Sequence, residues 1–160
     1  MFRLLSSLLI AMAIFAPSTR AAEDQKTPAK PTPDRAELEK QFAETMSNVT
    51  MVGNFTSGGK TDGLKEERYT LGEVKKQVGD IWLFPTRIQY GGHDVTLPLP
   101  LEVQWAGDTP VITLTKVAVP GLGTFTARVL IYDNQYAGTW NGGDHGGHLF
   151  GRIEKNAEKK

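Results

Sequence analysis

Apolar residues occupy every second position from Val95 to Trp105, and polar residues or prolines fill the positions between them. The apolar positions are Val95, Leu97, Leu99, Leu101, Val103 and Trp105. A period of two is typical of a β-strand with one apolar face. A helix would scatter these side chains around its circumference and would contain Pro98 and Pro100, at a cost of about 3 kcal/mol each. The pattern therefore predicts a strand.

The two prolines constrain the neighbours of this strand. Residues i and i+2 direct their N–H groups to the same side, so Pro98 and Pro100 remove two successive donors that would face one neighbouring strand. That side cannot be fully paired. Over residues 97–101 we expect the strand to run along a sheet edge, or along a gap or splayed corner in a barrel.

The same alternation continues on both sides, from Val49 to Ile153, with turn residues at short intervals. It predicts eight strands, at residues 49–56, 64–74, 81–90, 95–105, 111–119, 125–132, 136–141 and 148–153. Antiparallel strands joined by short turns form an up-and-down meander, and closure removes its edges. The predicted fold is all-β, an eight-stranded antiparallel up-and-down barrel whose interior holds side chains or one small ligand.

The N-terminal third has a different pattern. Residues 1–21 combine a basic start, an apolar run of about 13 residues and small residues before a candidate cleavage site. This pattern predicts a signal peptide and a secreted or periplasmic protein. Residues 22–33 are rich in proline and charge and predict a disordered linker. Residues 34–47 predict a helix, from about Arg35 to Met46, in which Leu38, Phe42 and Met46 recur every fourth residue on one face, and which lies against the barrel or plugs one end of it. The barrel domain spans residues 48–154, and residues 155–160 form a polar tail.

The resemblance to known proteins is carried by two segments. Gly53-Asn54-Phe55 in the first strand, the strand count and the small size resemble the calycin group of lipocalin-like and avidin-like barrels, although Phe55 stands where its Gly-x-Trp motif has Trp. Residues 124–153, with Tyr-Ala-Gly-Thr-Trp and Gly-Gly-His-Leu-Phe-Gly, are similar to small secreted bacterial proteins of unassigned activity. The resemblance implies a calycin-like barrel and no particular activity.

Composition excludes several function classes. The chain has no cysteine, so it has no disulfide, thiolate metal ligand or cysteine nucleophile. Removal of residues 1–21 takes away Arg3 and Arg20 but no acidic residue, which leaves 16 basic residues against 18 acidic ones and a net charge of −2. Such a surface does not attract nucleic acid. No later stretch approaches the roughly 20 apolar residues of a transmembrane helix, so we expect no membrane partner after signal removal.

Aromatic residues have two interpretations, as core filling or as the lining of a pocket. Buried Trp and Tyr need a partner for their N–H or O–H group, so a cluster of them in a barrel can line a small-molecule site. The candidate ligand-binding residues are Trp82, Tyr90, Trp105, Tyr136 and Trp140. The leading hypothesis is a non-enzymatic barrel that binds a small apolar or aromatic molecule or another secreted protein.

A glycine-flanked loop supplies the alternative hypothesis. Asp144, His145 and His148 lie within five residues, and with His93 they include every histidine of the chain. Imidazoles and a carboxylate bind zinc or copper where three or four of them converge. The competing interpretation, which we favour, is a solvated hairpin with glycines at positive φ, and hence no cofactor. If the loop does hold zinc, the protein is a metal-binding protein or a metal-dependent enzyme.

No catalytic residue is predicted. Ser47 and Ser57 are the only serines after residue 21, and neither lies in a Gly-x-Ser-x-Gly motif. The acidic residues of the strands are predicted to lie on solvated faces rather than to form a catalytic pair. These residues are Glu66, Glu67, Glu73 and Glu102.

Overall fold

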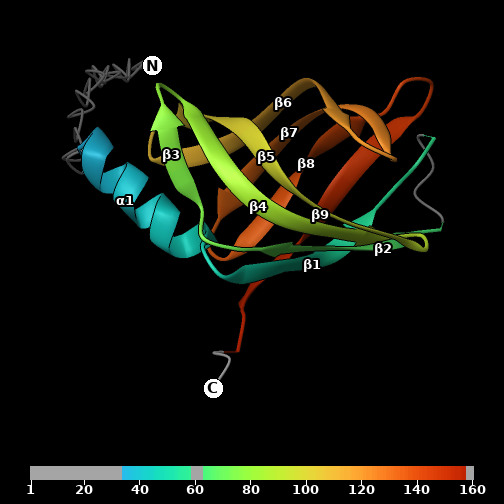
Figure 1. Ribbon diagram of the computed structural model, residues 1–160, viewed down its shortest axis with the longest axis horizontal. Helices are drawn as coiled ribbons and strands as arrows, with labels where there is room; N and C mark the ends of the chain where they lie inside the picture. Colours follow the sequence, from blue (N-terminus) through green and yellow to red (C-terminus); the bar gives the residue numbers. More distant parts are fainter. Residues whose placement is uncertain (1–33, 59–62, 158–160) are drawn as a thin grey trace, which may run out of the picture. The chain divides into compact units, whose positions relative to one another are not determined.

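The computed structural model describes residues 34–58 and 63–157 as one helix followed by nine strands (Figure 1). The predicted signal peptide and linker, at residues 1–33, and the last three residues of the predicted tail lie outside the described residues. The elements are α1 (Arg35–Met46), β1 (Val49–Phe55), β2 (Lys65–Leu71), β3 (Lys75–Val78), β4 (Ile81–Tyr90), β5 (His93–Ala106), β6 (Thr109–Val119), β7 (Gly123–Tyr132), β8 (Gln135–Asn141) and β9 (Gly146–Lys155).

Eight of the strands form the predicted closed antiparallel barrel. Each of these strands pairs with its neighbours along the chain, β1 pairs with β9, and β2 pairs with β4, which completes the ring. The ninth strand, β3, was not predicted and pairs with β4 at the end of the sheet order. The predicted strand at residues 64–74 ends at Leu71 because the chain then turns toward the end of α1, where the Val74 N–H donates to Ser47 Oγ at 2.9 Å.

The register around β5 confirms the prediction made from its prolines. Strand β5 pairs with β4 from His93 to Glu102 but with β6 only from Glu102 to Ala106. The Val103 N–H donates to the Asp80 carbonyl, beside β4. Because N–H groups of successive residues in a strand point to opposite sides, the even-numbered residues of β5, including Pro98 and Pro100, direct their nitrogens toward β6. The β5–β6 ladder therefore stops where the donors are missing, and the barrel wall is splayed beyond that point.

Helix α1 closes one end of the barrel, as Figure 1 shows. Its apolar face, Leu38, Phe42 and Met46, is buried, and the Phe42 ring packs edge-on against Trp82 at a centroid distance of 5.1 Å. Asp34 precedes the helix without a side-chain cap, and its carbonyl accepts the Leu38 N–H at 3.0 Å. Within the described residues, no helix has the length and apolar character that crossing a bilayer requires.

The last strand and its hydrogen bonds extend into the predicted polar tail, which was expected to start at residue 155. Strand β9 extends to Lys155, and the Asn156 N–H donates to the Asn48 carbonyl at 3.0 Å. The Asn156 side chain also accepts the Thr50 hydroxyl at 2.6 Å. These bonds anchor the chain to the start of β1, next to the helix.

Candidate functional site

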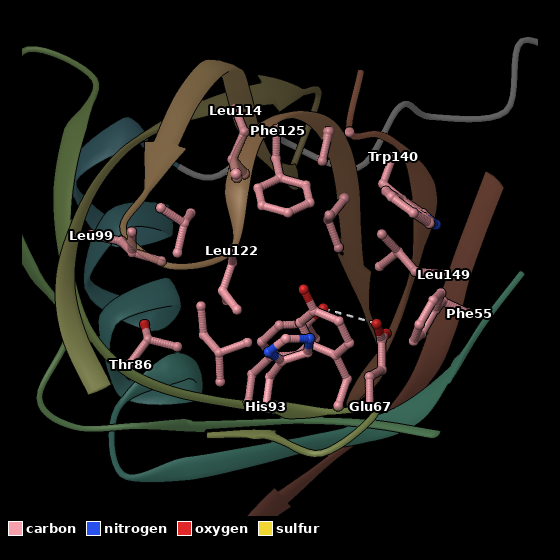
Figure 2. Close-up of a pocket in the computed structure, with 18 of the residues that line it drawn as sticks. Phe55, Glu67, Thr86, His93, Leu99, Leu114, Leu122, Phe125, Trp140 and Leu149 are labelled. Atoms are coloured by element: carbon pink, nitrogen blue, oxygen red, sulfur yellow. Dashed lines mark hydrogen bonds between the residues drawn. The ribbon is translucent and has the colours of Figure 1, made fainter. Parts of the chain in front are cut away.

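The barrel encloses a cavity of about 420 Å³ (Figure 2). Its wall is formed by side chains from the barrel strands, and its mouth lies at the end opposite α1, where the β4–β5, β6–β7 and β8–β9 connections contribute residues. This volume lies within the range of small-molecule sites, about 300–1,000 Å³. Residues that line the wall or mouth include Met51, Phe55, Thr86, Tyr90, His93, Leu99, Leu114, Leu122, Phe125, Ala127, Trp140 and Leu149.

Aromatic rings form one side of the cavity. The Phe55 ring packs edge-on against both Tyr90 and Trp140, with centroid distances of 5.8 and 5.6 Å. The Trp140 indole N–H donates to the Thr56 carbonyl at 3.0 Å, which fixes the orientation of the ring. These rings present a largely apolar surface to the cavity, and the indole N–H of Trp140 already has a partner, so they favour an apolar or aromatic guest.

Among the described residues, one carboxylate lines this largely apolar wall. Glu67 of β2 is 4% exposed, and Figure 2 places its side chain at the edge of the cavity. The Tyr69 hydroxyl donates to Oε2 at 2.8 Å, and the Tyr136 hydroxyl donates to Oε1 at 2.9 Å. Both carboxylate oxygens therefore have a donor, and a buried acidic group is held in a fixed orientation.

Two glycines make room for this arrangement. The strand registers align Tyr136, Gly151, Gly53 and Glu67 in one row across β8, β9, β1 and β2. A Cβ at Gly53 would lie 2.4 Å from the Tyr136 hydroxyl oxygen, and one at Gly151 would lie 2.7 Å from Tyr136 Cε1. The Tyr136 side chain crosses both strands to reach the carboxylate, and only glycine is small enough beneath it.

Burial shifts the pKa values of Glu67, Tyr69 and Tyr136. Burial raises the pKa of the Glu67 carboxyl, and the hydrogen bonds from Tyr69 and Tyr136 oppose that shift only in part. The pKa values of both tyrosines are also raised, first by burial and then by the neighbouring Glu67 charge. Both tyrosines therefore remain hydrogen-bond donors at any physiological pH.

The predicted ligand-binding residues divide into three groups. Tyr90 and Trp140 line the cavity. Tyr136 is buried, is not among the cavity residues and contacts the cavity residue Glu67 through its hydroxyl. Trp82 and Trp105 pack against Phe42 at the helix end of the barrel and are not among the cavity residues. No local pattern indicated which end of the barrel α1 would fill, and hence which of the five residues would border free space.

The predicted metal residues do not converge. His93 and His145 line the mouth, and their rings pack against Tyr90 and Trp140 at centroid distances of 5.1 and 5.4 Å. His148 is exposed on β9 beside the buried Leu149, so its side chain lies on the outer face. Within residues 34–58 and 63–157, no group of three His, Cys, Asp or Glu side chains is placed to hold a metal ion.

Asp144 pairs with one of these histidines. Its carboxylate accepts a hydrogen bond from His145 Nδ1 at 2.8 Å, and this contact lowers the pKa of Asp144. The Asp144 side chain is 98% exposed. The pair is therefore a solvated contact at the tip of the β8–β9 connection.

The prediction that Glu67 lies on a solvated face is wrong. The sequence of β2 is charged on both faces, so its hydrophobic pattern is weak. The sequence did contain an indication that Glu67 faces inward. Tyr69 and Leu71 lie two and four residues after Glu67, hence on the same face, and they are the apolar residues of that strand. Glu66 and Glu102 are exposed, as predicted.

The fold and site together define a closed eight-stranded antiparallel barrel with a helix across one end and a largely apolar cavity that contains a buried carboxylate. Comparisons of the chain with known protein families, with curated proteins and with solved structures found no match.

Proposed function

We propose that this protein binds one small, largely apolar molecule inside its barrel. The observation that carries the proposal is the cavity of about 420 Å³, lined by aromatic and aliphatic side chains and open at the end opposite α1. A packed barrel interior leaves few voids larger than a water molecule, so a cavity of this size favours a ligand-binding role over simple packing.

The construction of the helix end supports the same function. Phe42 and Met46 fill that end of the barrel, so the interior space is concentrated toward the mouth. Together with the predicted signal peptide, this arrangement makes a secreted or periplasmic carrier or receptor of a small molecule the proposed role. Zinc binding by the Asp144–His148 loop remains a prediction with no converging ligand set in the described residues to support it.

A matched pair of variants tests the proposal. Ala127 lines the cavity on β7, whereas Ala137 is exposed on the outer face of β8. The neutral fluorophore N-phenyl-1-naphthylamine should bind the wild-type protein with an increase in fluorescence. Ala127→Phe fills part of the cavity and should weaken that binding, whereas Ala137→Phe adds the same ring outside the barrel and should not.

The experiment has clear negative outcomes. Absence of saturable binding to the wild-type protein would contradict the proposal. Equal binding by Ala127→Phe and the wild type would place the probe outside the barrel and would favour the alternative that the protein docks another secreted protein. Circular dichroism of both variants shows whether they fold.

A further inference from the structure

The chemistry of Glu67 narrows the class of ligand, and this step rests on the proposed function. No Lys, Arg or His side chain of the described residues forms an ion pair with the carboxylate. Lys65 lies two residues away at the cavity mouth, and its ammonium nitrogen is 5.9 Å from the centroid of the Phe55 ring. Among the described residues, the acidic group in this largely apolar wall thus has hydroxyl donors but no paired cation.

The carboxylate retains unused acceptor capacity. An ionised carboxylate accepts about four hydrogen bonds, and the two tyrosine hydroxyls supply two of them. Because Glu67 itself lines the cavity, a donor on a bound molecule can approach its oxygens from that side. A molecule that is apolar throughout would leave this capacity unused while displacing solvent from it, which is unfavourable.

The aromatic neighbours of the carboxylate suit a positive charge. Tyr90 of β4 pairs in register with Glu67 of β2 and lines the same cavity, and Tyr69 lies two residues along β2 on the same face. Aromatic faces attract cations, whereas a negatively charged group would be repelled by the carboxylate. The tyrosine rings and the carboxylate therefore both favour a positively charged group on the ligand.

We propose that the ligand carries a protonated amine at one end of an apolar or aromatic body, and that the ammonium group donates to Glu67 inside the barrel. The apolar body then lies against the rings of Phe55, Phe125 and Trp140. Charge-assisted hydrogen bonds are stronger than neutral ones, so the ammonium–carboxylate contact provides selectivity while the apolar wall provides most of the buried surface.

Three probes with one common body test the proposal: 4-phenylbutylamine, 4-phenylbutan-1-ol and 4-phenylbutanoate, each titrated by calorimetry at pH 8. In the wild-type protein the amine should bind roughly tenfold to a hundredfold more tightly than the alcohol, which is the range of a hydrogen bond to a charged group. The carboxylate probe should bind most weakly. Glu67→Gln should abolish the preference for the amine over the alcohol, whereas Glu66→Gln, on the exposed face of the same strand, should retain it.

The outcomes separate this inference from the proposed function. If the alcohol and N-phenyl-1-naphthylamine bind but the amine has no advantage, the ligand class is wrong and the cavity still binds small molecules. A preference for the amine that persists in Glu67→Gln would also overturn the inference. If no probe binds at all, the proposed function itself fails.

A second measurement avoids dependence on the folding of one variant. In the wild-type protein the preference for the amine should decrease as the pH falls and Glu67 becomes protonated, while binding of the alcohol stays constant. The ionisable groups that face Glu67 or line the same cavity are Tyr69, Tyr90 and Tyr136, with Lys65, His93 and His145 at the mouth. His93→Gln and His145→Gln should each leave the pH dependence of the amine preference unchanged. Loss of that pH dependence in either variant would assign the effect to that histidine instead of Glu67.

Discussion

Replacement of Tyr136 by Phe removes a single hydroxyl group and retains the buried ring. Tyr136 is 2% exposed, and its hydroxyl donates to Glu67 Oε1 at 2.9 Å. Without that donor, Oε1 of the buried carboxylate has no hydrogen-bond donor among the described residues. We therefore expect Tyr136→Phe to lower the stability of the fold through the loss of one hydrogen bond and not through packing.

The structure sets the magnitude of this effect. Leaving a buried acceptor unsatisfied costs about 1–3 kcal/mol. Because Tyr69 still donates to Oε2 and because Glu67 borders a cavity that solvent can enter, the expected cost lies in the lower part of that range, about 1–2 kcal/mol. For a chain of this size, each kcal/mol lowers Tm by about 2–4 °C.

Urea denaturation at pH 8, followed by circular dichroism, measures the effect in a double-mutant cycle. Tyr136→Phe should lower the midpoint without changing the slope, and its cost should fall by at least half in a Glu67→Gln background. Tyr132→Phe serves as the control because Tyr132 is 67% exposed, and it should change little. An equal cost of Tyr136→Phe in both backgrounds would refute the role assigned to the hydroxyl.

Three further predictions concern the interior of the barrel. Burial raises the folded-state pKa of Glu67 above its usual value near 4.5. The stability of the wild type relative to Glu67→Gln should therefore be highest below pH 4.5 and should be lost as the pH rises through the folded-state pKa. Thermal melts from about pH 4 to 9 test this, and a difference in stability that does not change with pH would contradict it. Phe42→Ala should destabilise the fold by about 3–5 kcal/mol in denaturant titrations, because it opens a void beside Trp82, and a loss below 1 kcal/mol would mean that α1 is not part of the core. Leu99→Asp places a charge in the cavity wall and should prevent folding, whereas Glu102→Lys on the outer face should change stability by less than about 1 kcal/mol, and equal effects in thermal melts would contradict the assignment of faces.

Local pattern alone was sufficient for much of the fold. Alternation assigned the inner face of β5 correctly, because Leu99, Leu101 and Val103 are buried while their neighbours are exposed. The spacing of Leu38, Phe42 and Met46 predicted the buried face of α1. Both signals are periodicities, and they depend only on which side of an element faces the core.

The prolines of β5 carried information about a neighbouring strand. Proline lacks an N–H group, so its effect on a ladder is set by the residue itself and by parity along the strand. Pro98 and Pro100 thereby predicted unpaired backbone beside residues 97–101, and the β5–β6 ladder begins only at Glu102. The identity of the unpaired neighbour required the register.

The candidate site was decided by the tertiary structure. The side chains of Tyr136 and Glu67 come from strands β8 and β2, and their contact exists because the registers align them with Gly151 and Gly53 between them. No local pattern encodes a register between strands that are distant in sequence. The alternation of one strand is the same whichever residue of the neighbouring strand lies opposite. Periodicity in the sequence by itself therefore determined which faces of α1 and β5 turn inward, whereas closure of the barrel and packing of α1 against one end decided which inward residues meet and where space for a ligand remains.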